Sequence, residues 1–153
     1  MSYTLDTNTL INMERRYLRD LFTSLWDTLE AAAHQGEVCM CETAHKELDR
    51  GGDGLASWAK SIPDFICTAT NDELATVANI SRDHPGWAQG QKNYRDPFII
   101  AHAKRDGLVI VTEEGRKGPN TIDKNQTIPN IADEYRVECI TFFDLLRVQG
   151  WKF

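Results

Sequence analysis

Three short runs of apolar residues restrict the folds that this chain can adopt. Residues 38–41, 108–111 and 137–141 are each short enough to be a buried strand. The run at 108–111 shows no alternation of apolar and polar residues, which is typical of a parallel strand covered on both faces. A fourth short strand is expected to end at Asp6. Segments with helical character separate these strands, so the sequence predicts an α/β protein.

Helices are expected between the strands, over residues 9–14, 17–34, 43–50, 55–60, 72–82, 97–107, 128–133 and 142–149. The longest helix has an apolar stripe that should face the core: Leu18, Leu21, Phe22, Leu25, Trp26, Leu29 and Ala33. In the helix over 72–82, the inward residues are expected to be Leu74, Val77, Ala78 and Ile80. Residues 65–69 fit either an edge strand or an extended linker. Right-handed crossovers then give a three-layer α/β/α sandwich around a parallel sheet of four or five strands.

The composition is compatible with one domain over residues 1–153, because 41% hydrophobic residues suffice for a single core. The formal charge of -6 argues against non-specific adhesion to nucleic acid, although carboxylates that hold metal ions also make the formal charge negative. No apolar run approaches the roughly 20 residues of a membrane span. The N-terminus also lacks a basic segment followed by an apolar one, so we expect a cytoplasmic protein without membrane association.

The four cysteines, Cys39, Cys41, Cys67 and Cys139, lie in apolar, strand-like contexts, as expected for reduced core thiols. Cys39 and Cys41 share one face of their strand and, with His45, could begin a zinc site. No second cysteine pair at metal-binding spacing completes such a site. Buried thiols are therefore the favoured interpretation.

Carboxylates occur where strands end and where a helix begins. Asp6 ends the first strand, and Glu113 and Glu114 follow the strand over 108–111. Asp96 precedes a proline at an expected helix start, where its carboxylate would cap the helix. Parallel strands bring Asp6, Asp96 and Glu114 to one edge of the sheet. Two unit charges about 4 Å apart repel by roughly 4 kcal/mol at an effective dielectric of 20, so such a pocket calls for hard cations such as Mg²⁺ or Mn²⁺.

Two polar loops supply positive charge. Residues 87–95 combine cations with the aromatic residues Trp87 and Tyr94, which can bind phosphate and stack a base; a merely solvated loop is the alternative. Residues 115–128 form a polar loop whose length is typical of a functional or disordered segment. The candidate phosphate-binding residues in the two loops are Lys92, Arg95, Arg116, Lys117 and Lys124.

Four motifs follow one another along the chain: Leu5-Asp6-Thr7-Asn8-Thr9-Leu10-Ile11, Glu47-Leu48, Asp96 before Phe98-Ile99-Ile100-Ala101-His102-Ala103, and Val109-Ile110-Val111-Thr112-Glu113-Glu114. In this order and spacing they resemble the PIN domain, and most closely the VapC-like toxin ribonucleases of prokaryotic toxin–antitoxin modules. The stretch from Ile128-Pro129 to Trp151-Lys152-Phe153 also looks like one PIN-like subfamily. The resemblance covers nearly the whole chain.

This resemblance implies an Mg²⁺- or Mn²⁺-dependent endoribonuclease that hydrolyses RNA phosphodiesters by metal-activated water and leaves 5'-phosphate and 3'-hydroxyl ends. It also implies inhibition by a cognate antitoxin protein and, often, a homodimer. The loop cations listed above would contact RNA. The positions carried over as catalytic and metal-binding are Asp6, Glu47, Asp96 and Glu114, with Asn8 and Thr112 as polar support.

Several alternatives stay open. The family more often has aspartate at the fourth position, and Glu113 could replace Glu114 there. Glu42 competes with Glu47, which could also be a solvated surface residue. A further alternative is a PIN-like module that binds RNA or a protein without cutting. The complete set of acids disfavours it, because a pure binding surface gains nothing from buried like charge.

Overall fold

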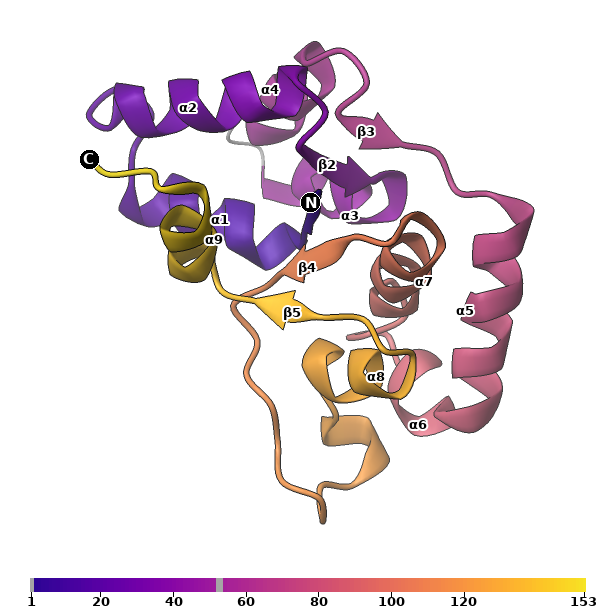
Figure 1. Ribbon diagram of the computed structural model, residues 1–153. Helices are drawn as coiled ribbons and strands as arrows, with labels where there is room; N and C mark the ends of the chain where they lie inside the picture. Colours follow the sequence, from indigo (N-terminus) through magenta and orange to yellow (C-terminus); the bar gives the residue numbers. More distant parts are fainter. Residues whose placement is uncertain (1, 52–53) are drawn as a thin grey trace.

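The computed structural model describes residues 2–51 and 54–153 (Figure 1). At its centre is a sheet of five parallel strands in the order β3-β2-β1-β4-β5. The strands are β1 (Tyr3–Leu5), β2 (Val38–Cys41), β3 (Ile66–Cys67), β4 (Val109–Val111) and β5 (Cys139–Ile140). The predicted parallel sheet is confirmed, and the ambiguous segment 65–69 contributes the edge strand β3.

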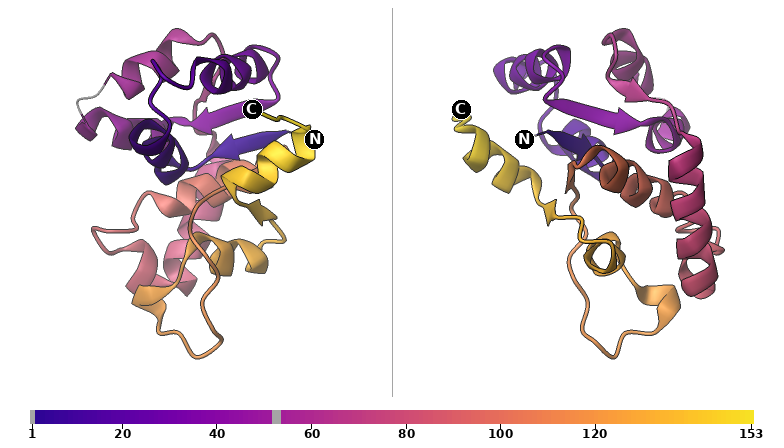
Figure 2. Two further views of the ribbon diagram at one scale, coloured as in Figure 1. Left: turned by 90° about the vertical axis from the view of Figure 1, so that its left-hand side faces the viewer. Right: turned by 45° about the vertical axis from the view of Figure 1, so that its right-hand side comes forward.

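Helices cover both faces of the sheet. They are α1 (Thr7–Arg16), α2 (Thr23–His34), α3 (Glu42–Leu48), α4 (Leu55–Ser61), α5 (Asn71–Asp83), α6 (Pro85–Ala88), α7 (Asp96–Asp106), α8 (Ile128–Glu134) and α9 (Phe142–Gln149), with short 3-10 turns η1 (Asp49–Gly51) and η2 (Asp123–Asn125). Helices α1, α2 and α9 lie on one side of the sheet and α5 and α7 on the other (Figures 1 and 2). This arrangement is the predicted three-layer sandwich. No helix among the described residues is long and apolar enough to cross a bilayer.

Strand β1 lies in the middle of the sheet, with β2 and β3 on one side and β4 and β5 on the other. On one side β1 pairs with β2, with Tyr3 opposite Val38, and on the other it pairs with β4, with Leu5 opposite Val111. The first connections extend the sheet outward to β3. The connection through α5, α6 and α7 then returns the chain to β4. The carboxyl ends of β1 and β4 therefore meet at a topological switch point, where open α/β sheets bind their ligands.

Helix α2 is shorter than the sequence indicates. A helix was expected over residues 17–34, but α2 begins at Thr23, and Leu18, Leu21 and Phe22 are 45%, 70% and 43% exposed. The carbonyl of Tyr17 accepts a hydrogen bond from a tryptophan indole of α2 instead of continuing a helical ladder. The expectation that the whole stripe is core is wrong for its first turn. Its remaining members are buried: Leu25, Trp26, Leu29 and Ala33.

The rotation of α5 also differs from the expectation. Ile80 is buried as expected and Val77 is partly buried, but Leu74 is 48% exposed and Ala78 faces solvent, whereas Glu73 is buried. The Glu73 carboxylate lies 3.4 Å from the ring of buried His102 in α7, so a polar pair and not apolar periodicity decides which face of α5 is covered. Thr70 caps α5, because its side-chain oxygen accepts the backbone N–H of Glu73 (3.3 Å).

The long loop between β4 and α8 is held against α6. The ring of His84 bridges two carboxylates, with Nδ1 2.8 Å from Asp123 and Nε2 2.6 Å from Glu134. Burial lowers the pKa of His84, but these hydrogen bonds and charges outweigh it, so the net pKa lies above the ordinary value. The Gly86 N–H donates to Asp123 (2.8 Å), and a Cβ on Gly86 would lie 2.9 Å from the same oxygen. Only glycine fits this approach without a shift.

Candidate acidic and lysine-lined site

Asp6 and Thr112 directly follow the last paired residues of β1 and β4. The backbone N–H of Asp6 donates to the carbonyl of Val111 (2.9 Å), which continues the register of the two strands. The Thr112 hydroxyl donates to Asp6 Oδ2 at 2.8 Å, and Asp6 is only 4% exposed. The structure thus brings together two polar side chains that are 106 residues apart in the sequence.

Asn8 fixes the geometry around Thr112. Its Nδ2 donates to Thr112 Oγ1 (3.5 Å), and its Oδ1 accepts the backbone N–H of Glu113 (3.2 Å). The backbone N–H of Glu114 also donates to Thr112 Oγ1 (3.2 Å). The hydroxyl therefore donates once and accepts twice, which uses its full hydrogen-bonding capacity. The orientation of the Asp6 carboxylate is consequently well defined.

Asp96 faces the other acids and does not cap its helix. The N-cap of α7 is Arg95, and no side-chain cap hydrogen bond is present there, so the expected carboxylate cap is wrong. Burial, followed by the charges of Asp6, Glu114 and Glu47, raises the pKa of Asp96 to about 9. Burial also raises the pKa of Asp6 to about 7, with added repulsion from Glu114 and Glu47, while the threonine hydrogen bond lowers it.

Glu114 belongs to the same environment. Burial and the charge of Glu47 raise its pKa, whereas a hydrogen bond from the backbone N–H of Ile128 (3.2 Å) and the charge of Lys92 lower it. The net pKa of Glu114 lies above its ordinary value. The mutual repulsion couples four acids from four separate segments: Asp6, Glu47, Asp96 and Glu114.

The two alternative acids have other partners. Glu113 is exposed, and its carboxylate accepts the first backbone N–H of α9 (3.2 Å). The carboxylate of Glu42 accepts a backbone N–H just after β3 (2.9 Å). The geometry therefore favours Glu114 over Glu113 and Glu47 over Glu42.

The donor set suits a hard divalent cation. All four acids offer oxygen, and within residues 2–51 and 54–153 none of them forms an ion pair with lysine or arginine. No three of their oxygens lie within 4.8 Å of one another in this described part. Mg²⁺ is commonly held by one or two carboxylates and several waters, so wider spacing of the acids is compatible with it. The residues fit Mg²⁺ or Mn²⁺.

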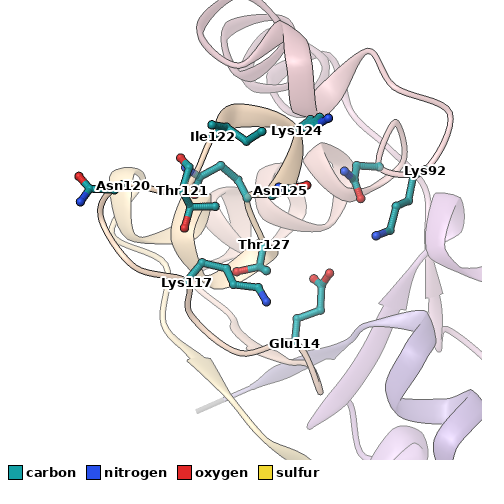
Figure 3. Close-up of a pocket in the computed structure, with 11 residues that line it drawn as sticks. Lys92, Glu114, Lys117, Asn120, Thr121, Ile122, Lys124, Asn125 and Thr127 are labelled. Carbon is teal, nitrogen blue, oxygen red and sulfur yellow. The ribbon is translucent and has the colours of Figure 1, made fainter.

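A pocket of about 570 Å³ adjoins Glu114 and is lined largely by polar side chains. Lys92 and Lys117 point toward the space in front of the Glu114 carboxylate, and Lys124 lies on the far rim (Figure 3). The charge of Lys92 lowers the pKa of both Asp96 and Glu114, which places this ammonium group near the acids. Three of the five candidate phosphate-binding cations thus line one pocket.

The other two candidates are engaged with neighbouring side chains. Arg116 forms a bidentate ion pair with Asp133 of α8, at 2.8 and 2.7 Å. The Nε of Arg95 donates to the Tyr94 hydroxyl (2.6 Å), and its guanidinium lies 5.1 Å from the centre of that ring. Trp87 is completely buried, so the expectation that it stacks a base is wrong. Tyr94 remains exposed.

Two groups of residues were not found from the sequence. One consists of pocket amides, Asn93, Asn120, Asn125 and Gln126. The other is a cluster of Cys39, Cys67 and His102, drawn from three elements whose contact no sequence spacing reveals. His45, considered as a zinc partner of Cys39 and Cys41, instead hydrogen-bonds with the carbonyl of Ala56 (2.9 Å). All four cysteines are free thiols, as expected, but only Cys41 is buried. Cys39, Cys67 and Cys139 are partly exposed, so the expectation of buried core thiols is wrong for these three.

A family model described as Domain of unknown function (DUF4411) matches residues 3–153, which is nearly the whole chain. The description of this family names no activity. No curated protein matches the chain significantly.

Proposed function

The chain belongs to the DUF4411 family, and we propose that it is a metal-dependent endoribonuclease. Its reaction is the hydrolysis of RNA phosphodiester bonds with Mg²⁺ or Mn²⁺ as cofactor. The observation that carries the proposal is the convergence of Asp6, Glu47, Asp96 and Glu114 at the switch point of the sheet, beside a lysine-lined pocket. Asp6 is buried and the other three acids are partly buried. Like charges gathered in such a site, with raised pKa values as for Asp6 and Asp96, are characteristic of functional sites.

These four acids would hold the divalent cation. When bound, the cation supplies Lewis-acid chemistry toward water and toward the phosphate. Thr112 fixes the orientation of Asp6 through its 2.8 Å hydrogen bond, and Asn8 holds Thr112 in turn. Asn8 and Thr112 therefore act as positioning residues.

The lysine-lined pocket supports a polyanionic substrate. The ammonium groups of Lys92 and Lys117 point toward the space before Glu114, where they would neutralise phosphate oxygens (Figure 3). The pocket volume of about 570 Å³ lies within the usual range for ligand sites. Its asparagine side chains offer both donors and acceptors to base edges. Unpaired RNA exposes such edges, so single-stranded RNA is the preferred substrate class.

A cleavage assay tests this proposal. Single-stranded RNA incubated with the protein should be cut with Mn²⁺ or Mg²⁺ and remain intact with EDTA. Asp6→Asn and Asp96→Asn should each abolish cutting, whereas Asp27→Asn, on the exposed face of α2, should retain it. Cutting that persists in Asp6→Asn would contradict the site assignment.

A non-catalytic RNA- or protein-binding module is the alternative, and the lysine-lined pocket alone is compatible with it. A bound cation raises the stability of the folded form by mass action. If the protein is a metal-dependent nuclease, Mn²⁺ should raise the melting temperature of the parent protein. It should not raise the melting temperature of Asp96→Asn. RNA binding without cutting, together with no effect of Mn²⁺ on melting, would favour the alternative.

Within the same proposal, the protein acts as the toxin of a toxin–antitoxin pair, with an antitoxin protein and a second copy of the chain as partners. An exposed apolar surface on the α1–α2 and α9 side supports a protein partner, because large apolar patches commonly mark interaction sites. It surrounds a pocket of about 440 Å³ and includes Leu21, Phe22, Phe143 and Phe153. Expression of the parent should slow bacterial growth, and Asp6→Asn should not. Equal growth inhibition by both would contradict a role for cleavage.

A further inference from the structure

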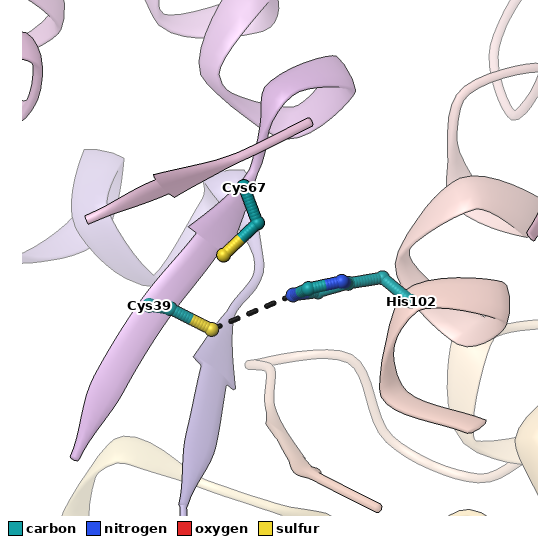
Figure 4. A group of neighbouring side chains, drawn as sticks. All are labelled: Cys39, Cys67 and His102. Atoms are coloured by element: carbon teal, nitrogen blue, oxygen red, sulfur yellow. Dashed lines mark hydrogen bonds between the residues drawn. The ribbon is translucent and has the colours of Figure 1, made fainter. Parts of the chain in front are cut away.

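Cys39, Cys67 and His102 form a cluster that is separate from the acidic pocket. Cys67 lies opposite Cys41 in the register of β2 and β3, and Cys39 is two residues before Cys41. The side chains of Cys39 and Cys67 therefore leave the sheet on the same face. Helix α7 presents His102 toward them (Figure 4). The two Sγ atoms and an imidazole nitrogen all lie within 4.8 Å of one another.

The spacing of these atoms is close to that of a tetrahedral zinc site. Zn–S distances near 2.3 Å and Zn–N distances of about 2.0–2.1 Å place sulfur and nitrogen ligands about 3.6 Å apart. In the structure, Cys39 Sγ lies 3.4 Å from His102 Nε2. Cys39 and Cys67 are each partly exposed, so an ion can enter and a solvent molecule can complete the coordination. Only a small adjustment of side chains is required.

His102 is oriented as imidazole ligands of metals usually are. Its Nδ1 lies 3.4 Å from Glu73 and 3.6 Å from Asp106, while its Nε2 faces the sulfur of Cys39. The side chains of His102 and Glu73 are 1% and 2% exposed. When a carboxylate accepts the Nδ1 proton, the lone pair of Nε2 is left to bind a metal, and this arrangement fixes the ring and strengthens the ligand. Such a role accounts for a glutamate buried where α5 would otherwise bury an apolar side chain.

We propose that Cys39, Cys67 and His102 bind Zn²⁺, with Glu73 as the residue that positions His102. Two thiolates balance the charge of the ion, and their soft sulfur atoms select a different metal from the oxygen ligands of the acidic pocket. The ion ties β3, an edge strand of two residues, to β2 and to α7, the helix that begins at Asp96. The site is independent of the proposed nuclease activity.

Reduced, metal-free protein titrated with Co²⁺, a spectroscopic substitute for Zn²⁺, tests the proposal. The parent should develop thiolate-to-cobalt charge-transfer absorption that saturates at one equivalent and disappears when Zn²⁺ is added. Cys39→Ser and Cys67→Ser should each lose most of this absorption. Two matched controls should keep it: Cys139→Ser, on β5 at the opposite edge of the sheet, and Asp96→Asn, in the acidic pocket. The second control separates this site from the nuclease proposal.

Glu73→Gln tests the positioning role, since it keeps both thiolates. Its zinc affinity should fall about 10- to 100-fold, the usual effect of losing such an outer carboxylate, while the charge-transfer absorption remains inducible at higher Co²⁺. Circular dichroism verifies that each variant is folded. If Cys39→Ser does not fold, Cys67→Ser decides, because Cys67 is partly exposed on a short edge strand.

Two results would overturn the proposal. One is a parent protein that shows no charge-transfer absorption with Co²⁺ while its thiols are reduced. The other is absorption that persists in folded Cys67→Ser at the parental Co²⁺ concentration.

Discussion

Replacing Asp6 with asparagine should stabilise the metal-free protein while it abolishes RNA cleavage. Burial, with the charges of Glu114 and Glu47, raises the pKa of Asp6 from 3.8 to about 7. Each pKa unit corresponds to about 1.36 kcal/mol, so ionised Asp6 costs the folded protein at most about 4 kcal/mol relative to the unfolded chain. Asparagine removes this charge, and its Oδ1 can still accept the hydrogen bond from Thr112.

This stabilisation should depend on pH in a defined direction. Well below pH 3.8, Asp6 is protonated in both the folded and the unfolded state, and its charge costs nothing. Between 3.8 and about 7 the unfolded chain has lost the proton that the folded chain retains, so the parent loses stability as the pH rises. Above about 7 the cost is constant. The advantage of Asp6→Asn in free energy of unfolding should therefore grow up to neutral pH and then level off.

Urea unfolding of the parent and Asp6→Asn in EDTA, at several pH values from about 5 to 8, measures this advantage. Adding Mn²⁺ should then raise the stability of the parent and leave the variant nearly unchanged. Asp27→Asn, which removes an exposed charge from α2, should show neither effect. If Asp6→Asn were less stable than the parent above neutral pH, or gained as much from Mn²⁺, the reasoning that crowded carboxylates form a cation site would be refuted.

Three further predictions concern the surroundings of the site. Glu114→Gln should abolish cleavage, whereas Glu113→Gln should retain most of it, because the Glu113 carboxylate serves only the start of α9; equal cleavage rates would contradict this assignment. Changing Lys117 and Lys124 to alanine should weaken RNA binding and reduce the slope of log affinity against log salt by about 0.7 per lysine, and an unchanged slope would exclude these lysines as phosphate contacts. His84→Gln should lower the free energy of unfolding at acid pH. The pKa of His84 is raised in the folded protein, so its protonation contributes stability that is fully present below pH 6.5 and is lost as the pH rises through the folded pKa. A difference in free energy of unfolding that is the same at all pH values would contradict this.

The strands of the sheet could be predicted because each is marked by a run of neighbouring residues in the sequence. The apolar run at 38–41 coincides with β2, and the run at 108–111 contains β4, since a strand covered on both faces needs neighbouring apolar residues and little else. The start of α2 could not be predicted, because it depends on an indole of the helix bonding to the distant carbonyl of Tyr17. The rotation of α5 could not be predicted for the same reason, since Glu73 follows its partner His102 and not the apolar pattern.

The candidate site also contains features that could be predicted from the sequence and features that could not. Asp6 and Thr112 could be placed together from the sequence, because parallel strands of matched length must end at the same edge. Which cations face the acids could not be foreseen. Lys117 lines the pocket while its neighbour Arg116 pairs with Asp133, and that choice is made by the position of α8. Predictions that follow from chain direction succeed here, and those that depend on side-chain partners from other elements do not.

Helix α7 contributes to both proposed metal sites, and its geometry explains how they stay distinct. Asp96 and His102 are six residues apart, which is about 9 Å along the helix axis and about 240° around it. The two side chains therefore leave the helix in different directions, one toward oxygen donors at the switch point and the other toward sulfur beside the edge strand. Mn²⁺ favours the oxygen donors and Zn²⁺ favours the sulfur donors. The affinity for each ion should therefore fall only when a residue of that ion's own site is substituted. An ion whose binding responds equally to Asp96→Asn and Cys67→Ser would show that the helix couples the two sites.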